Sequence, residues 1–386
     1  MIKKIFIYTF FIGICFFSLQ STSAANITVN PGQSIQSAVN HASSGDTIIV
    51  NDNHNQSYTY NESVIINKKL NIIANGKVSI DAKNSNSAAL TVYSGGSGTS
   101  IENFKVAKTN YAIVICDAQN CLIEHNSISG VSLVGIQFYG DITNSRVYYN
   151  NITGLNAKQG NGISFEDGTV SDNTIYGNTI RNFLNGILFN DKSVNNIIEK
   201  NRVYSTDYTG AGIYTTDNSN NMQILSNEVI GARDGIAVQK MGSGMACNYL
   251  ISGNVVKNNV NGFWIQLTGS KILKNTATSN KVSGLDITGS YNTIEYNTAT
   301  GNDNCGISLG RYSSADHNLV SHNVLSYNIA GINSASRGST ISYNTVTFNK
   351  NNGIISVANN VTIVGNIINN TARRIIAEGT DVTCQS

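Results

Sequence analysis

The chain has 386 residues, of which 12% are charged, and it holds 35 glycines, six cysteines and one proline. Removing Lys3 and Lys4 from the 25 basic residues leaves 23, which equals the number of acidic residues. A chain that is neutral beyond its first 25 residues is unlike a nucleic-acid-binding protein, because binding to phosphates calls for a basic face.

The first 25 residues predict a cleavable signal peptide. Lys3 and Lys4 precede an apolar run of 15 residues, Ile5 to Leu19, and small residues follow at positions 23–25. This order of charge, apolar run and small residues is typical of secretory signals. The run is shorter than the roughly 20 residues that a membrane span needs. We therefore expect a secreted or extracellular protein, either released or associated with the cell wall, with no membrane span after cleavage.

Residues 26–80 are predicted to form an N-terminal cap and the first strands. Ser34 can cap a short helix, since its hydroxyl can accept a bond from the first turn. The apolar residues of that helix are spaced for one face, and they are Ile35, Ala38, Val39 and Ala42. Such a helix would close the open end of a stacked structure, which repeat proteins require for solubility.

Residues 81–372 are predicted to be repeats, built from two alternating motifs. The first is a glycine followed by alternating apolar residues, as in Gly162 to Phe165, and it recurs every 22 to 27 residues. The second places apolar residues three before and two after an asparagine. Its eleven asparagines are Asn126, Asn150, Asn178, Asn201, Asn227, Asn254, Asn275, Asn297, Asn323, Asn344 and Asn366.

These repeats indicate a solenoid of short strands. Alternation at period two with β-branched residues is typical of strands that have one buried face. Two or three strands fit in each repeat, without room for helices. Stacked at about 4.8 Å per coil, twelve coils would form a rod of about 55 Å. The sequence therefore predicts an all-β, single-stranded parallel β-helix of about 12 coils, with residues 373–386 as a C-terminal cap or tail.

The repeated asparagines are interpreted as structural. Asparagine tolerates the left-handed backbone of a sharp bend between strands, and stacked amides can hydrogen-bond into a ladder. Leucine-rich repeats also carry an asparagine at a similar period. They are disfavoured, because isoleucine and valine replace leucine and the connections contain turn residues rather than helix formers.

The N-terminal region carries a family resemblance. Residues 31–38, of the form Pro-Gly-x-Ser-Ile-Gln-x-Ala, are followed by Gly45-Asp46-Thr47-Ile48 and then by Tyr60 to Ile66. Together with the repeats, this opening resembles the pectin-lyase-like β-helix proteins, and most of all the NosD-like and adhesin-like surface proteins of methanogenic archaea and bacteria. The resemblance implies a right-handed β-helix. It implies function only weakly, because this fold hosts lyases, hydrolases, epimerases, adhesins and tailspikes.

Residues two and four after each repeat glycine are expected to face outward, since residues one and three face the core. Rings beside amides are typical of a sugar-binding face, because rings stack on pyranoses and amides bond to hydroxyls. The predicted ligand-binding residues are Trp264, Tyr214, Tyr139, Gln137, Gln239 and Gln266. The expected partner is a polysaccharide or a cell-surface glycan. The alternative for Trp264 is packing under a neighbouring turn.

A column of aspartates is the weaker candidate for a catalytic or metal-binding site. Asp167, Asp191 and Asp217 each stand five residues after a repeat glycine, on consecutive coils. Stacked carboxylates could bind Ca²⁺, or act on a glycosidic bond with Glu166 and Arg181. The alternative is that each aspartate ends a strand by bonding to its own turn. No other cofactor or metal site is expected.

Signatures of enzymes with this fold are missing from the sequence. The only proline is Pro31, which leaves no Arg-x-Pro-x-x-Arg stretch of pectate lyases and no Asp-Pro-His of alginate epimerases. The leading hypothesis is therefore an adhesin-like protein that binds carbohydrate or another cell surface. The alternatives are a polysaccharide lyase or hydrolase, and a structural component of the cell envelope.

Two further features are left open by the sequence. Five cysteines follow the signal peptide, and only Cys116 and Cys121 are close enough in sequence to form a local bridge across a turn. Free thiols are the equal alternative. Asn61 and Asn151 begin Asn-x-Ser/Thr triplets, which permit N-glycosylation in a host that performs it.

Overall fold

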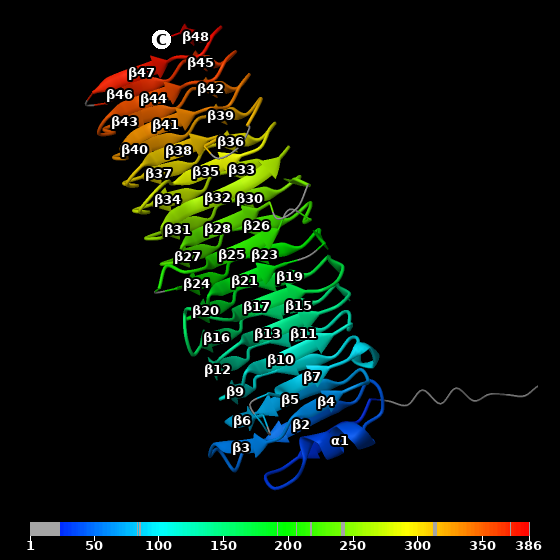
Figure 1. Cartoon of the computed structure of the whole chain (residues 1–386). Coiled ribbons are helices and arrows are strands. Elements are labelled where there is room, and N and C mark those ends of the chain that lie inside the picture. The colour runs from blue at the N-terminus through cyan, green and yellow to red at the C-terminus, as the bar shows by residue number, and fades with distance from the viewer. Residues whose placement is uncertain are drawn as a thin grey trace, which may run out of the picture.

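The computed structural model describes residues 24–385, except 83, 85, 191, 206, 217, 241–243, 312–314 and 371. The predicted signal peptide, residues 1–25, lies outside the described residues apart from Ala24 and Ala25. The described chain is a right-handed parallel β-helix, an elongated stack with helix α1 (Ile35–His41) at one end and the C-terminus at the other (Figure 1). Every paired strand ladder of the three long sheets is parallel.

Three long sheets run the length of the stack. The 16-stranded sheet contains β1 (Asn26–Val29), β2 (Thr47–Asn51), β5 (Asn71–Asn75), β8 (Ser100–Glu102), β11 (Leu122–Glu124), β15 (Arg146–Tyr148), β19 (Thr174–Tyr176), β23 (Ile197–Glu199), β26 (Gln223–Leu225), β30 (Leu250–Ser252), β33 (Lys271–Leu273), β36 (Thr293–Glu295), β39 (Leu319–Ser321), β42 (Thr340–Ser342), β45 (Thr362–Val364) and β48 (Thr383–Gln385). The 14-stranded sheet contains β3 (Tyr58–Asn61), β6 (Val78–Asp81), β9 (Lys105–Ala107), β12 (Ser127–Val131), β16 (Asn151–Gly154), β20 (Thr179–Arg181), β24 (Arg202–Tyr204), β27 (Glu228–Ile230), β31 (Val255–Lys257), β34 (Thr276–Thr278), β37 (Thr298–Thr300), β40 (Val324–Ser326), β43 (Thr345–Thr347) and β46 (Ile367–Asn369).

The 15-stranded sheet contains β4 (Val64–Ile66), β7 (Ala88–Val92), β10 (Tyr111–Cys116), β13 (Val134–Tyr139), β17 (Asn161–Glu166), β21 (Asn185–Phe189), β25 (Ala211–Thr216), β28 (Asp234–Gln239), β32 (Asn261–Thr268), β35 (Leu285–Thr288), β38 (Cys305–Leu309), β41 (Ala330–Ser334), β44 (Asn352–Ser356) and β47 (Arg373–Ala377), with β29 (Ala246–Cys247) beside β32. A small sheet joins β14 (Ile142–Thr143), β18 (Val170–Ser171) and β22 (Ser193–Val194), and η1 (Ser94–Gly96) is a short 3-10 turn.

The stack has about 15 turns, so the predicted number of about 12 is too low. The reason is that coils continue into regions where the two motifs are degenerate. Strands β1 to β6 pair with later coils at the N-terminal end, and β46 to β48 pair with earlier coils at the C-terminal end. On a spacing of about 4.8 Å, 15 coils form a rod of about 70 Å.

Equivalent residues of successive coils stack directly over one another inside the helix. Phe138 pairs in register with Phe165, and Phe165 with Phe189. Their rings are stacked with centroids 4.4 Å apart at both steps, and all three side chains are fully buried. Since each coil buries its apolar edge only against its neighbours, the core is one continuous column.

Helix α1 covers the N-terminal end, as the sequence predicts. The Ser34 hydroxyl accepts a hydrogen bond from the Ser37 amide, and Ile35 and Val39 are buried against the first coil. Glu62, between β3 and β4, accepts bonds from the amides of Ile35 and Gln36 at 2.9 and 3.0 Å. A carboxylate at these amides is favourable, because the first turn of a helix has unsatisfied donors.

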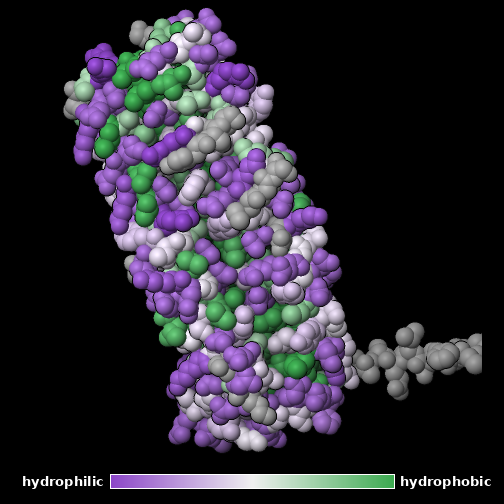
Figure 2. Space-filling view, viewed as in Figure 1, coloured by the Kyte–Doolittle hydropathy of each residue, from purple (hydrophilic) through white to green (hydrophobic). Residues whose placement is uncertain are grey.

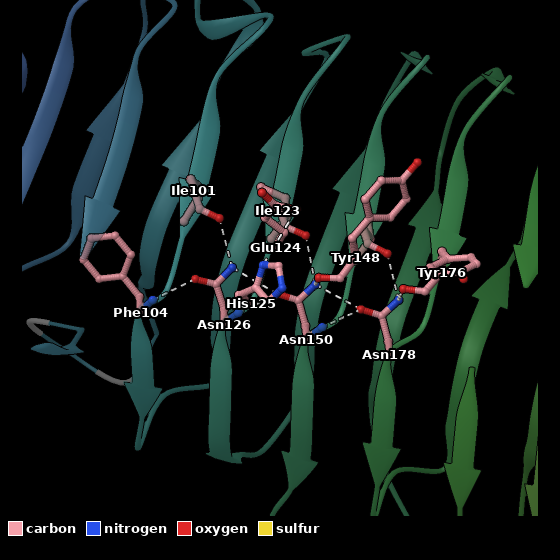
Figure 3. Close-up of polar contacts among 11 residues, drawn as sticks. Ile101, Phe104, Ile123, Glu124, His125, Asn126, Tyr148, Asn150, Tyr176 and Asn178 are labelled. Carbon is pink, nitrogen blue, oxygen red and sulfur yellow. Dashed lines mark hydrogen bonds and ion pairs between the residues drawn. The ribbon is translucent and has the colours of Figure 1, made fainter. Parts of the chain in front are cut away.

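The predicted asparagine ladder is confirmed at the corner between the 16-stranded and 14-stranded sheets (Figure 3). The Asn126 amide nitrogen donates to Asn150 Oδ1 at 3.0 Å, and Asn150 donates in the same way to Asn178. Each of these oxygens also accepts the backbone N–H of the asparagine before it, at 2.9 Å. The ladder satisfies buried polar backbone at every turn of the corner.

The role assigned to the asparagine backbone is wrong at this corner. The left-handed conformation belongs to the residue before the ladder asparagine, for example His125 with φ of 55° and Tyr149 with φ of 54°. The physical reason is that the bend must turn one side chain out and the next one in. The outward residue therefore takes the left-handed backbone, and the asparagine points into the stack.

Two further ladders follow at the other corners. Asn259, Asn280, Asn302, Asn328, Asn349 and Asn370 form one of them, between the 14-stranded and 15-stranded sheets. Asn173 and Asn196, with Asn292 and Asn318 further along, occupy the third corner together with serines such as Ser145 and Ser339. The structure therefore uses buried amides at all three corners.

Candidate functional site

The outward face of the 15-stranded sheet is the candidate site, and its alternation is as predicted. Ile136 and Phe138, one and three residues after Gly135, are fully buried, whereas Gln137 is partly exposed and Tyr139 is 44% exposed. The same alternation places Tyr214, Ala237, Trp264 and Asp286 in one outward column, each in register with the next.

Trp264 is half-buried at the centre of this column. The Arg233 guanidinium carbon lies 5.8 Å from the centre of its ring, which is a cation–π contact. Arg233 is held in place by Asp234, whose Oδ2 accepts from the Arg233 Nε at 2.9 Å. Asp234 is completely buried, and its other oxygen accepts from the Asn261 amide at 2.7 Å. A buried carboxylate thus fixes the cation above the ring.

The structure brings four of the six predicted ligand-binding residues together. Tyr214, Gln239, Trp264 and Gln266 come from the consecutive strands β25, β28 and β32. The Tyr214 hydroxyl donates to Gln239 Oε1 at 3.2 Å. Gln266 Oε1 accepts the backbone N–H of Lys240 at 2.5 Å. The rings and amides therefore form one polar and aromatic surface.

The other two predicted residues lie on the same face but outside this group. Gln137 and Tyr139 belong to β13, which is three strands before β25 in the sheet. On a coil spacing of about 4.8 Å, that separation is about 14 Å. Gln137 and Tyr139 therefore lie on the same outward face, closer to the N-terminal end of the rod.

Several residues predicted to face outward are buried. Ser164 and Ala237 are fully buried, Leu188 is 9% exposed and Asp286 is 3% exposed. These positions alternate with core residues as predicted, yet little of each side chain is exposed to solvent. The alternation of a strand predicts the direction of a side chain but not what lies on top of it.

Asp286 is the residue of this face that the sequence reasoning overlooked. Its side chain is 4% exposed and lies 3.9 Å from the Arg311 guanidinium. In the described structure no hydrogen bond reaches Oδ1. Burial raises the pKa of this carboxyl to about 6, against the lowering effect of the Arg311 charge. The signal was present in the sequence, since Asp286 is the one acidic residue two positions after a repeat glycine.

The aspartate column is described only in part, because Asp191 and Asp217 lie outside the described residues. Asp167 has a left-handed backbone with φ of 60°. Its charge and a hydrogen bond raise the pKa of the Tyr139 hydroxyl. Asp167 also borders a groove of about 430 Å³ with Asp141, Gly168, Thr169, Lys192 and Asn218. Binding of Ca²⁺ there stays a prediction.

Asp117 stands at the position equivalent to Asp167 two coils earlier, and it has a structural role. Asp117 Oδ1 accepts the backbone N–H of Asp141 at 3.0 Å, and Asp141 in turn accepts the backbone N–H of Thr169 at 2.8 Å. Each carboxylate thus ties one connection to the next coil. The sequence allowed the alternative that each aspartate bonds to the backbone of its own turn. These two carboxylates do bond to backbone, but to the backbone of the next coil.

The two remaining catalytic candidates do not meet. Glu166 ends β17 on the 15-stranded sheet and lies 3.4 Å from the Asn161 amide nitrogen. Arg181 ends β20 on the 14-stranded sheet, where it bonds to Asn151 and lies over the Tyr204 ring. Arg181 therefore lies on a different sheet from Glu166.

The described residues contain no group of three or more His, Cys, Asp or Glu side chains that could hold a metal ion. Cys116 and Cys121 are both free thiols, so the local bridge that the sequence allowed is not formed.

Within the described chain, no helix is long and apolar enough to cross a membrane. Figure 2 shows a mainly polar surface on which apolar side chains gather most clearly toward the C-terminal end.

Two family descriptions match the sequence. Residues 88–245 match "Right handed beta helix region", and residues 218–383 match "Periplasmic copper-binding protein (NosD)". A search among curated proteins found no match. The first match covers strands β7 to β28, and the second covers strands β26 to β47.

Solved structures of similar fold include proteins with three different roles. The tailspike of Escherichia coli bacteriophage HK620, solved with a hexasaccharide, has a TM-score of 0.58 at 10% identity over 90% of this chain and 75% of that one. The surface adhesin PfbA of Streptococcus pneumoniae has a TM-score of 0.46 at 12% identity, covering 90% and 87%. The periplasmic alginate epimerase AlgG has a TM-score of 0.45 at 13% identity, covering 85% and 78%.

Proposed function

Because this chain is a right-handed parallel β-helix, we propose that it is exported and binds a polysaccharide or cell-surface glycan on its 15-stranded sheet. The predicted signal peptide supports export. The balance of charges and the lack of recognised catalytic motifs support binding rather than catalysis.

The observation that carries this proposal is the environment of Trp264. The only tryptophan of the chain occupies an outward position, with a cation fixed near its ring and the Tyr214–Gln239 pair on the two preceding coils. Rings bind the apolar faces of sugars, while amides and guanidinium groups bond to hydroxyls and carboxylates. The HK620 tailspike, solved with a hexasaccharide, supports the use of this fold for glycan recognition.

A glycan array combined with a whole-cell adhesion assay tests the proposal. We expect the purified mature chain to bind a subset of glycans, and Trp264→Ala to lose that binding by at least tenfold, which corresponds to about 1.4 kcal/mol. Tyr296→Ala is the matched control, since Tyr296 is an exposed ring at the corner between the 16-stranded and 14-stranded sheets, away from this face. No binding in either assay by a folded protein, or equal losses in both variants, would refute the proposal.

A polysaccharide-cleaving enzyme is the second candidate, and Asp286 is the observation that favours it. A carboxyl whose pKa is near 6 can donate a proton to a leaving oxygen at neutral pH. Asp286 lies next to Trp264 in the same outward column. Incubation with neutral and uronate polymers, read by reducing ends and by unsaturated products, tests this alternative. Activity that Asp286→Asn abolishes would favour the enzyme.

A further inference from the structure

Six asparagines begin Asn-x-Ser/Thr triplets. They are Asn26, Asn55, Asn61, Asn151, Asn360 and Asn369. This triplet is the acceptor sequence for N-linked glycans, and an acceptor must lie on the surface of an exported protein. The exposure of each acceptor side chain in the structure therefore shows whether an oligosaccharyltransferase could reach it.

All six acceptor asparagines are exposed. In the described part of the chain, none of their side-chain nitrogens donates a hydrogen bond. Asn151 is an example: its side chain is exposed, and the one hydrogen bond described for it is accepted by its Oδ1 from the Arg181 guanidinium at 3.1 Å. The acceptor nitrogens are accordingly accessible.

The ladder asparagines show the opposite arrangement. Asn201 is fully buried, and its amide nitrogen donates to Asn227 Oδ1 at 3.0 Å and to the Ile175 carbonyl at 2.9 Å. None of the eleven ladder asparagines starts a triplet, because the core residue two positions later is apolar. The chain thus contains two separate populations of asparagine, one structural and one chemically available.

The six acceptors also share their placement around the helix. Asn61, Asn151 and Asn369 lie on β3, β16 and β46 of the 14-stranded sheet, and Asn26 lies on β1 of the 16-stranded sheet. Asn55 is in the connection between β2 and β3, and Asn360 is in the connection between β44 and β45. No acceptor lies on a strand of the 15-stranded sheet.

We propose that these exposed asparagines are N-glycosylated, and that the outward face of the 15-stranded sheet is kept free of glycans. In the reaction the side-chain nitrogen of the acceptor forms a bond to the anomeric carbon of a lipid-phosphate-linked oligosaccharide. The bond from that carbon to the phosphate oxygen breaks, the lipid phosphate leaves, and the nitrogen loses one proton. No oxidant or reductant is needed.

Such glycans would add bulky hydrophilic groups at three strands of the 14-stranded sheet and near both ends of the rod. One side would then remain for contact with other molecules. This asymmetry does not depend on what the 15-stranded face binds, so the modification can be tested separately from the proposed glycan binding.

Peptide mass spectrometry of the protein isolated from its own cells tests the proposal. We expect glycan mass on peptides that contain Asn61 and Asn151, and none on peptides that contain only ladder asparagines. Unmodified Asn61 and Asn151, or glycans on residues of the 15-stranded sheet, would overturn it.

Variants expressed in a secretory host with an oligosaccharyltransferase give the matched control. Thr153→Ala breaks the triplet of Asn151 and should abolish its modification, whereas Thr153→Ser keeps the triplet and should retain it. Both changes are on an outward position of β16, so the fold should persist in each. Equal occupancy of Asn151 in the two variants, or none in the unaltered protein, would contradict the proposal.

Discussion

The asparagine ladder and the outward face of the 15-stranded sheet are built on the same coils but follow different rules. At the ladder, successive coils repeat one residue with the same bonds, as in Asn227, which donates to Asn254 and accepts from Asn201. On the outward face, neighbouring coils carry Tyr214, Ala237 and Trp264 at one equivalent position.

The difference shows which positions of a repeat protein determine the fold and which positions can vary between coils. A buried amide must satisfy both neighbours, so a change in one coil breaks bonds in three. Outward side chains do not repeat one bond from coil to coil, so the residue at an outward position can differ between coils. We therefore expect the largest losses of stability at the ladder and the most specific effects on binding at the outward face.

Asn227→Ala should give the largest loss of stability. The change removes the acceptor of the Asn201 amide and backbone N–H, and the donor to Asn254 and to the Ile198 carbonyl. Each buried group left without a partner costs about 1–3 kcal/mol. We expect the free energy of unfolding to fall by roughly 3–5 kcal/mol, measured by chemical denaturation.

The control for this experiment is Asn258→Ala. Asn258 is an exposed asparagine with φ of 56° in the same coil as Asn254, between β31 and β32. Alanine tolerates that backbone less well than asparagine does, so a loss of about 1 kcal/mol is expected. If both variants lost the same stability, the ladder would have no special role.

Asp286→Asn should stabilise the protein at neutral pH. The folded pKa of about 6 lies above the value of the free side chain, so the folded state binds this proton more tightly than the unfolded state does. The contribution of Asp286 to stability is therefore full below about pH 4 and is lost as the pH rises through about 6. Asparagine does not ionise and avoids this loss.

Thermal unfolding of the wild type and Asp286→Asn, compared at pH 4 and pH 7, measures the effect. The stability gained by the variant should be on the order of 2 kcal/mol larger at pH 7 than at pH 4. A difference that does not change with pH would mean that the carboxyl is not held in an environment that favours its neutral form.

Trp264→Ala should separate binding from stability. The ring is half-buried on the outward face, so its removal should lower the free energy of unfolding by about 1 kcal/mol while weakening glycan binding at least tenfold. Denaturation and array binding, measured on the same preparation, check this expectation. A loss of stability as large as that of Asn227→Ala would place Trp264 with the structural residues instead.

The repeats predicted the fold and the ladder because stacking imposes the same requirement on each coil. The capping helix was predictable for a similar reason, since Ser34 and the apolar spacing are local signals. Burial of outward positions such as Ser164 and Ala237 was not predictable, because it depends on connections that vary from coil to coil. The neighbours of Arg181 were not predictable either, because the sequence does not show that Asn151 and Tyr204 of the adjacent coils lie against it.

The corner between the 14-stranded and 15-stranded sheets offers a test in which two adjacent residues should behave in opposite ways. Tyr327 is 59% exposed, has φ of 57°, and stacks on Phe348 with ring centroids 5.4 Å apart. Asn328, the next residue, is fully buried and donates to Asn349 Oδ1 at 3.1 Å and to the Ala299 carbonyl at 3.0 Å. One side chain faces solvent, and the other belongs to the second ladder.

Tyr327→Asn should have the smallest effect of the series. Asparagine suits the left-handed backbone better than tyrosine does, which offsets the loss of an exposed ring contact. We expect the free energy of unfolding to stay within about 0.5 kcal/mol of the wild type. Asn328→Ala should instead cost several times more. If Tyr327→Asn were the more damaging change, the aromatic stack on the outside of the corner would support the fold as strongly as the amide ladder inside it.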